Sequence, residues 1–590
     1  MKKSVLFSMM AIAIAFSMVL SACATATPTA APAAPAATTA PAAPAATTAP
    51  AAPAATTAPA APASPAATTA PAAPAFTPAS LSAPDCTYGG ELKSIVALDA
   101  ETVQFTLCQP DVAFPAKIAF ASNEILPKAL LDSTGGDSNK ISQAPVGTGP
   151  YILKEWVRGD HMTLTANPNY WGTPPAVKTL VLKWATEPAG RLLQLQSGDA
   201  DGIDNVGPDD IATVQKDSTL KLYPRVVDNV MYLGMNNTVK PFDNESVRQA
   251  FAMAINKAQI VKEFYPAGST VADEFVPSTL EPGYTPGLAD WPYDPAKAKA
   301  MLTAAKFDFS QTFPLSFRDA DRSYISQQPK VAQEIQAELA SIGVKVKLDQ
   351  QESATLLQNS AAGKLTFFIL GWGEDYPDAT DWYDYHFNEQ HKDFGTPYPD
   401  IVAAYKIGTS GTDNATRQKA YDTVNQLIHQ HVPLIPVAHS SSSVAMKASI
   451  GNVIIGPYNE NFEDMTTSSG QLVFVQNAEP ISLYFADETD GETERACRLL
   501  YTPLLDYQWG GVGSQPALAT SYDKSADLTQ YTFHLRPGVK FSDGSVLTAN
   551  DVVASFAAQW DAKNPDHKGN KGVYEYFTTL FTQFLNAPKS

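Results

Sequence analysis

The residues with the most evident chemistry lie in one short segment, GWGEDYPD at residues 371–378, which follows an apolar stretch at residues 365–370. The pattern places carboxylates among aromatic rings at the end of an expected strand. A carboxylate in such a place forms a stronger charge-assisted bond to a cation once it is shielded from water. Left unpaired, it would oppose burial. The segment is therefore a candidate binding site, and the alternative is a solvated acidic loop that begins with a core tryptophan.

Further acidic and histidine side chains follow and raise the question of a metal site. They are Asp378, Asp381, Asp384, His386, Glu389 and His391. Such oxygen-rich groups suit calcium or magnesium better than zinc, but their spacing lacks the glycine turn and the alternation of a calcium loop. We therefore expect neither a metal nor a cofactor. His429 and His431 point in different directions on an expected helix, which favours surface or packing roles.

The sequence lacks the motifs of the common catalytic classes. It has no Gly-x-Ser-x-Gly elbow, no His-Glu-x-x-His pair, no phosphate-binding glycine loop with a lysine and no Cys-x-x-Cys unit. The formal net charge of −19 also argues against nucleic acid, whose binding needs clustered Lys and Arg on one face. We expect a binding protein rather than an enzyme.

The elements that must position the candidate site are predicted to be alternating strands and helices. Half-buried strands are indicated at residues 180–184, 344–348, 472–475 and 531–535. A helix is expected over residues 331–342, with Gly343 as its stop, and another after Asp294 as N-cap. The roughly 500 residues that follow the N-terminal segments exceed what one core usually spans, so we expect at least two α/β lobes.

The N-terminal residues are typical of an exported lipoprotein. An apolar run at residues 5–20 follows two lysines and ends at Leu-Ser-Ala-Cys23, and it is shorter than the ~20 residues of a membrane span. We expect residues 1–22 to be a signal peptide and Cys23 to be lipidated. Residues 23–84 are expected to be a disordered spacer, because repeats of Ala, Pro and Thr cannot form a core. The protein would then lie outside the cytoplasm on its lipid anchor, in a periplasm or at the cell surface.

Three cysteines remain besides Cys23, an odd number in a compartment where disulfides persist. We favour a bridge between Cys86 and Cys108, because both lie in one segment and the bridge would pin the start of the folded part. The alternative is that these two and Cys497 are all buried free thiols.

Several blocks of the sequence are similar to those of a known family. Three lie near the C-terminal end, at residues 517–522, 531–541 and 542–553, and four lie earlier, at residues 145–151, 167–172, 241–250 and 254–257. They resemble the family 5 extracellular solute-binding proteins, which are the capture components of peptide, dipeptide and nickel importers. The first three resemble the N-terminal signature of that family. Because blocks that resemble the N-terminal part of the family stand near the C-terminal end of this chain, the order of the segments resembles a circular permutation of the family's order.

The resemblance implies an α/β fold of the two-lobed periplasmic-binding-protein type (class II), circularly permuted and with an accessory subdomain. The expected parts are an accessory subdomain at 85–140 and 506–590, a first lobe at 141–237 and 438–505, and a second lobe at 238–437. Crossings near Asn237 and near Ala438 would form the hinge. We expect a monomer, and the alternative is a dimer in which the tail of one chain completes its neighbour.

The resemblance also implies roles for residues of the candidate site. Asp375 would bind the ammonium of a peptide, Trp372 would line a side-chain pocket and Tyr376 would shape its wall, with Trp382 as a further ligand-binding ring. The implied function is capture of peptides by closure of the lobes and delivery to the permease of an ABC importer.

Two other functions stay open at this stage. An oligosaccharide is the alternative ligand, because aromatic rings such as Trp372, Trp382 and Tyr383 suit sugar faces. A surface adhesin held away from the cell by the spacer is the alternative from a different class.

Overall fold

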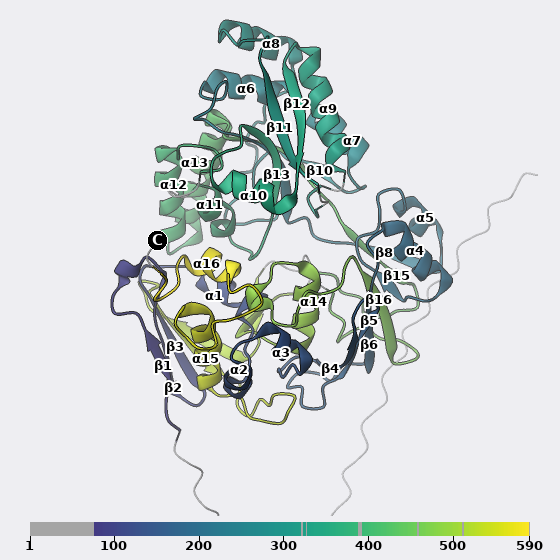
Figure 1. The fold of residues 1–590 in the computed structure, drawn as a ribbon, viewed down its shortest axis with the longest axis vertical. Coiled ribbons are helices and arrows are strands. Elements are labelled where there is room, and N and C mark those ends of the chain that lie inside the picture. The colour runs from purple at the N-terminus through teal and green to yellow at the C-terminus, as the bar shows by residue number, and fades with distance from the viewer. Residues whose placement is uncertain are drawn as a thin grey trace, which may run out of the picture. The chain divides into compact units, whose positions relative to one another are not determined.

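The computed structural model describes residues 76–588, apart from 320–321, 326, 388–391, 457–459 and 510–512. Helices and strands alternate along the chain and the strands form four sheets (Figure 1), which confirms the α/β fold. None of the helices in the described residues is long and apolar enough to cross a membrane. The expected signal peptide, Cys23 and most of the spacer lie outside the described residues, so these assignments stay predictions.

A seven-stranded sheet lies in the lobe drawn at the bottom of Figure 1, which we call the first lobe. Its strands, in spatial order, are β4 (Tyr151–Val157), β5 (His161–Ala166), β6 (Thr179–Trp184), β16 (Gln471–Gln476), β7 (Gly202–Ile203), β15 (Ser443–Lys447) and β8 (Leu220–Pro224). β16 is parallel to both β6 and β7, and it places Leu472 and Phe474 in the core without exposed surface. The C-terminal segment therefore supplies a central strand of this sheet.

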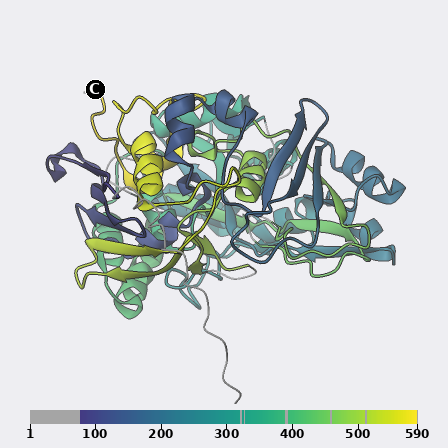
Figure 2. The same ribbon diagram turned by 90° about the horizontal axis from the view of Figure 1, so that it is seen from below.

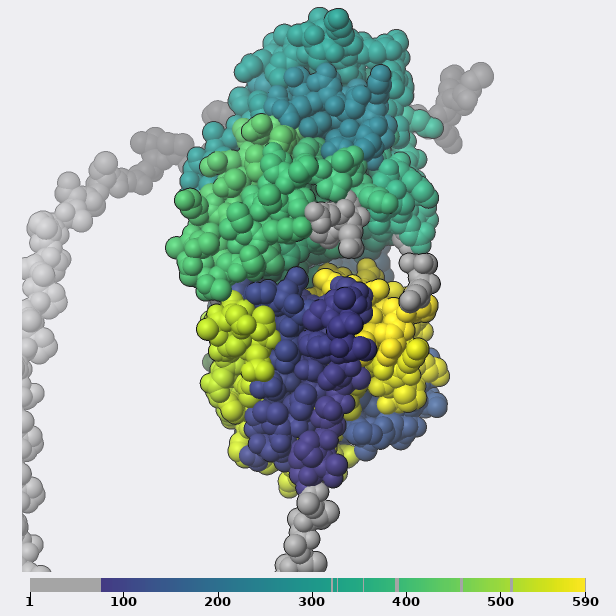
Figure 3. Space-filling view, turned by 90° about the vertical axis from the view of Figure 1, so that its left-hand side faces the viewer, coloured from purple at the N-terminus to yellow at the C-terminus, as the bar shows by residue number. Residues whose placement is uncertain are grey.

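A five-stranded antiparallel sheet completes the first lobe. Its order is β1 (Ser80–Ser82), β2 (Leu92–Asp99), β3 (Thr102–Leu107), β20 (Gln530–Leu535) and β19 (Ala519–Lys524). Figure 2 shows the purple strands from the N-terminal part beside the yellow-green strands from the C-terminal part, and in Figure 3 the purple surface lies between yellow-green and yellow surfaces. Phe105 of β3 packs at 5.7 Å from Phe533 and at 5.0 Å from Phe556, which fixes a helix on the sheet.

Helices of the first lobe pack on these sheets, and a short ribbon joins them. The helices are α1 (Phe114–Ile118), α2 (Lys128–Thr134), α3 (Ser138–Gln143), α4 (Pro188–Ser197), α5 (Ile211–Lys216), α14 (Gly491–Leu500), α15 (Ala549–Trp560) and α16 (Glu575–Phe581). The ribbon is β17 (Leu505–Tyr507) with β18 (Ser514–Pro516). In Figure 1, α16 is drawn on the side of this lobe that faces the second lobe.

The second lobe is built on a six-stranded mixed sheet. Its order is β10 (Thr270–Val271), β14 (Leu434–His439), β9 (Asn229–Met235), β13 (Phe367–Gly373), β11 (Thr312–Arg318) and β12 (Lys345–Gln351). Its helices are α6 (Glu245–Ala254), α7 (Lys257–Phe264), α8 (Pro295–Ala304), α9 (Gln328–Ser341), α10 (Ser353–Ala361), α11 (Ala379–Phe387), α12 (Pro399–Ser410) and α13 (Asn414–His431). Two separate apolar clusters pack here, one around Phe251 and Phe367 and one around Phe275 and Tyr421.

Local sequence signals located several of these elements. α9 covers the helix expected over residues 331–342, and Gly343 beyond it adopts a φ of +94°. Asp294 caps α8 by accepting a hydrogen bond from the backbone N–H of Lys297 at 2.8 Å. β13 ends later than expected, because its pairing with β9 continues as far as Gly373 opposite Asn229.

The expected end of the spacer at residue 84 needs correction. Residues 80–82 form the edge strand β1, in which Ser80 pairs with Val96 and Ser82 pairs with Ser94. Ala83 has only 3% of its surface exposed. The backbone hydrogen bonds of this short strand override its low-complexity composition, so the folded part begins before residue 80.

The structure joins Cys86 to Cys108 in a disulfide with a Cα–Cα distance of 5.5 Å, which is the pairing that the sequence favours. Cys497 on α14 is a buried free thiol, and burial raises its pKa. Such a thiol is inert, because the thiolate is the reactive form.

A buried network of four charges holds α14 to the first lobe. Arg495 donates from Nε to Glu460 Oε2 at 2.7 Å and from Nη2 to Asp204 Oδ2 at 2.5 Å. Arg225 donates to Asp204 Oδ1 at 2.8 Å and also to Glu460. Burial alone would raise the pKa of Asp204, but the two guanidinium groups hold it below its usual range. These ion pairs therefore hold together four separate segments of the chain.

We predict that Arg495→Ala lowers the free energy of unfolding by about 3–5 kcal/mol, because removal of one partner leaves buried carboxylates uncompensated. Denaturant unfolding followed by circular dichroism measures the change. Lys524→Ala on the exposed edge strand β19 is the control, with an expected change within about 0.5 kcal/mol. Equal stability of the Arg495 variant and the parent would show that the network does not hold α14 in place.

Candidate functional site

The carboxyl end of β13 delivers the acidic segment to the boundary between the lobes. β13 lies between β9 and β11, and the next residue, Glu374, donates its backbone N–H to the carbonyl of Asp228 at 2.9 Å. The chain then turns into α11, where Asp378 Oδ1 accepts from the Thr380 N–H at 3.0 Å and pairs with Arg417 at 2.5 Å. Asp378 therefore anchors the turn, and Asp375 stands at its tip.

A second carboxylate, Asp381, lies beside Asp375. Its Oδ2 accepts from Trp372 Nε1 at 2.9 Å and from the backbone N–H of Asp375 at 3.1 Å. Its other oxygen, Oδ1, is buried and has no hydrogen-bond partner among the described residues. Asp381 thus holds the Trp372 indole and the turn with Oδ2, while Oδ1 can accept a further hydrogen bond.

The predicted aromatic residues occupy different places around this pair. Trp372 is half-buried and stacks on Tyr385, with ring centroids 4.4 Å apart. Tyr376 is 3% exposed and packs into the apolar core of the first lobe, and its hydroxyl lies 3.1 Å from Thr380 Oγ1. Tyr376 therefore joins the two lobes rather than lining an open pocket wall.

The expectation that Trp382 contacts the ligand is not supported by its position. Its side chain has no exposed surface and packs edge-on against Phe275, with centroids 5.6 Å apart. Tyr383 is also fully buried. Both rings belong to the core of the second lobe because α11 turns this face inward, which removes two of the rings that suited a sugar.

The C-terminal segment contributes three side chains around Asp375. Tyr507 donates to the carbonyl of Asp375 at 3.3 Å and lies 3.1 Å from the carbonyl of Ala116. Tyr576 of α16 lies close enough to Asp375 to lower its pKa as a donor, and the charge of Glu494 of α14 raises it. Because these residues come from the first lobe, they cover the carboxylate only while the lobes are together.

The electrostatics of the site favour a cation. Burial raises the pKa of Asp375 to about 8, the charge of Glu494 adds to the shift, and the bond from Tyr576 opposes it. Burial and the neighbouring Asp375 likewise raise the pKa of Asp381, and burial raises that of Asp228 to about 7. Carboxyl groups in such surroundings hold protons at neutral pH unless a cation replaces them.

A loop of the C-terminal segment is held by one carboxylate, Asp487. Its two oxygens accept hydrogen bonds from five consecutive backbone N–H groups of residues 570–574, over 2.6–2.9 Å. Consecutive N–H groups that converge in this way form an anion-binding nest. The nest directly precedes α16 and so fixes the position of Tyr576.

Two arginines near the site were missed by sequence reasoning. Arg318 ends β11 and donates to Ser353 Oγ at 2.8 Å, and the exposed Arg322 donates to the same hydroxyl at 3.2 Å. Ser323 lies beside the end of β13, since a Cβ built on Gly373 would be 4.0 Å from its hydroxyl. The pattern Arg-Asp-Ala-Asp-Arg was visible at residues 318–322, but only the sheet brings it beside the acidic turn.

The sequence comparison decides the family. The family model described as "Bacterial extracellular solute-binding proteins, family 5 Middle" matches residues 47–394 and 514–576. The chain belongs to this family. The resemblance inferred from the motifs, and the two-lobed fold that it implied, are thus confirmed.

Several relatives in this solute-binding family are named for peptides, and one of Haemophilus influenzae (strain ATCC 51907 / DSM 11121 / KW20 / Rd) is named for heme. The dipeptide-binding protein of Escherichia coli (strain K12) is 28% identical over 386 residues, which span 64% of this chain and 71% of the relative. Di/tripeptide-binding protein 3 of Pseudomonas aeruginosa (strain UCBPP-PA14) is 30% identical over 375 residues, 62% of this chain and 69% of the relative. Among solved structures, HbpA2 from Haemophilus parasuis matches with a TM-score of 0.57 and 27% identity, covering 65% of this chain and 76% of that one.

Among the described residues, those considered for a metal do not converge in this family member. Asp384 accepts from Thr409 at 3.0 Å, and His386 Nδ1 lies 2.8 Å from the carbonyl of Trp382. In the part of the chain that the structure describes, no three His, Cys, Asp or Glu side chains form a metal-binding group. Glu389 and His391 lie outside the described residues. The predicted packing role of the other two histidines agrees with the stacking of His429 on Trp291 and the pairing of His431 with Glu245 and Asp400.

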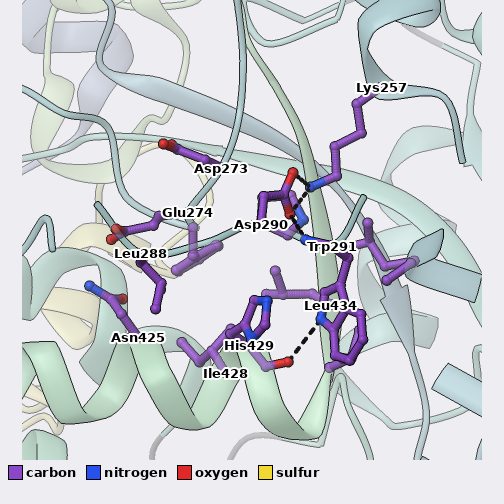
Figure 4. A pocket seen from close by; sticks show the side chains of 15 residues that line it. Lys257, Asp273, Glu274, Leu288, Asp290, Trp291, Asn425, Ile428, His429 and Leu434 are labelled. Carbon is purple, nitrogen blue, oxygen red and sulfur yellow. Dashed lines mark hydrogen bonds and ion pairs between the residues drawn. The ribbon is translucent and has the colours of Figure 1, made fainter. Parts of the chain in front are cut away.

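Two cavities lie away from the acidic turn. One, inside the second lobe, has a volume of ≈ 20 Å³ and is lined by Glu274, His429 and the Lys257–Asp290 ion pair over an apolar floor (Figure 4). It has room for about one water molecule and not for a peptide. The other, of ≈ 110 Å³, lies in the first lobe between Trp171 and Arg498.

Proposed function

We propose that this protein is the extracytoplasmic capture component of an ABC importer and that its ligand is a peptide, held between the two lobes. The observation that carries the proposal is the position of Asp375, a carboxylate covered by the opposite lobe and bordered by other carboxylates. A peptide ammonium supplies the missing positive charge. The names of the relatives in Escherichia coli and Pseudomonas aeruginosa support this ligand class.

The site offers an oppositely charged side chain to each end of a short peptide. Asp375 receives the ammonium, Trp372 flanks the first side chain, and Arg322, with Arg318 behind it, offers a guanidinium to the carboxylate. Arginine suits this task because its planar fork matches a carboxylate. The ligand contacts both lobes only when they are together, so binding shifts the population toward the closed form. That form would dock on a permease, and lipid at Cys23 would keep the protein at the membrane.

We further propose that the segments of this family member are circularly permuted within one chain. The support is the central position of β16 in the seven-stranded sheet and the position of β20 between β3 and β19 in the five-stranded sheet. A link of five residues, 466–470, leads into β16. The expected end of the first lobe at residue 237 needs correction, because β9 (Asn229–Met235) is an inner strand of the second-lobe sheet, so the chain crosses between the lobes before Asn229 rather than near Asn237. The other expected boundaries belong to the same proposal.

A permuted single chain predicts a monomer in solution. Light scattering after size exclusion, over a concentration series down to the nanomolar range, measures the mass. A stable dimer at nanomolar concentration would instead indicate exchange of the C-terminal segment between two copies.

We predict that Asp375→Asn weakens binding of Ala-Ala by about 100-fold, because a buried charge-assisted bond is lost. Isothermal titration calorimetry measures the affinity. Asp384→Asn is the matched control, since Asp384 is a half-buried carboxylate on α11 that accepts a hydrogen bond from Thr409, and we expect its affinity to stay within about threefold of the parent. Unchanged affinity in the Asp375 variant would refute the ammonium role.

We predict that the affinity for Ala-Ala rises from pH 6 to about pH 8. The pKa of Asp375 is raised to about 8 by burial, so below that pH the ammonium must displace a proton, which costs up to about tenfold per pH unit. Above about pH 8 the peptide amine loses its own charge. Calorimetric titrations of the parent and of Asp375→Asn between pH 6 and pH 8 measure the affinity. An affinity of the parent that does not change over this range would contradict the prediction.

A further inference from the structure

The acidic turn holds more carboxyl groups than one ammonium can pair with. Asp375 and Asp381 are adjacent, and the charged groups that act most strongly on Asp375 are the carboxylates of Glu494, Glu575 and Asp228. Those that act on Asp381 are Asp375 and Glu374. The guanidinium of Arg498 is engaged with Glu494 at 3.1 Å and with Asp506 at 2.8 Å. A single bound ammonium would replace the proton of one carboxyl group and leave the others protonated, so a second cation on the ligand would still find a carboxyl group to pair with.

Asp381 independently indicates that the acidic turn can accept a second hydrogen-bond donor from a ligand. The residue is 3% exposed, and its Oδ1 atom is buried without a partner among the described residues, although its Oδ2 atom holds two hydrogen bonds. A donor on a ligand, or a water molecule, can satisfy a buried acceptor of this kind. Tyr507 and Tyr576 of the first lobe lie close enough to Asp375 and Asp381 to interact with both electrostatically. Separation of the lobes would move these tyrosines away and expose the two carboxyl groups to a ligand.

The neighbouring rings suit a positively charged side chain. Trp372 donates its indole N–H to Asp381 and stacks on Tyr385, so two aromatic rings border the acidic turn. A cation over the face of such a ring gains further attraction, which increases when water is excluded.

We propose that this site selects peptides whose first residue is basic, with Asp375 receiving the terminal ammonium and Asp381 receiving the cation of the first side chain. The proposal rests on the proposed function, since it assumes that the ligand is a peptide held at this turn. It names the substrate class more narrowly: a short peptide that begins with lysine, ornithine or arginine.

The test compares three dipeptides by isothermal titration calorimetry at pH 7.5. Lys-Ala carries the second charge on its first residue, norleucine-Ala has a first side chain of similar length without the charge, and Ala-Lys carries the charge one residue further on. Ala-Lys controls for the general attraction of cations to a protein with net charge −19. We expect the parent to bind Lys-Ala at least about tenfold more tightly than the other two, as one additional charge-assisted bond would give.

The variant Asp381→Asn separates the role of the charge from that of the fold. Asparagine keeps an acceptor for Trp372 and for the N–H of Asp375, so we expect norleucine-Ala to bind within about threefold of the parent while the preference for Lys-Ala disappears. Asp384→Asn, on the same helix, should retain the preference. Titrations in buffers of different ionisation enthalpy should show that Lys-Ala releases more protons from the parent than norleucine-Ala does.

The outcomes distinguish this inference from the proposed function. Equal binding of Lys-Ala and norleucine-Ala to the parent, or a preference that survives Asp381→Asn, would overturn the selectivity proposed here and leave peptide capture standing. Failure of all three peptides to bind a folded parent would overturn peptide capture itself, and this inference with it.

Discussion

The pairing of Arg225 and Arg495 with Asp204 and Glu460 is the constraint on which the rest of the structure depends. It ties α14 to the strands of the first lobe, and the segment that begins at β16 and continues through α14 and α16 carries Glu494, Tyr507 and Tyr576 to the acidic turn. Buried ion pairs contribute little net stability compared with apolar packing, but they penalise every arrangement that separates the partners. The network therefore fixes which segments lie together, and the apolar core supplies most of the free energy.

Desolvation connects this architecture to ligand binding. The carboxylates at the end of β13 are costly to bury alone, so under the proposed function the closed arrangement is favoured when a cation arrives with the ligand. Tyr376, which lies in the second lobe along the chain, packs into the core of the first, and Tyr507 bonds back to the carbonyl of Asp375. The contacts that exclude water from the acidic turn therefore also join the lobes. Under the proposed function, binding of the ligand at this turn is thereby coupled to closure of the lobes.

Local patterns in the sequence were enough to find strands such as β6, β16 and β20, the helix α9 and its glycine stop, and the family to which the chain belongs. They also pointed to the acidic turn. They could not find what depends on contacts between distant residues: the burial of Trp382 against Phe275, the pairing of Ser80 with Val96, or the nest around Asp487. Arg322 was overlooked for the same reason, since only the pairing of β11 with β13 brings it near the turn.

The pairing of β3 with β20 has a consequence for biogenesis. Gln104 and Thr532, which bond across these strands, are separated by 428 positions, so β3 is synthesised long before its partner. Until β20 has been synthesised, the edge of β3 is open to pairing with other polypeptides. Completion of the five-stranded sheet is thereby delayed until the C-terminal segment is available, and folding chaperones have an exposed strand to protect in the meantime.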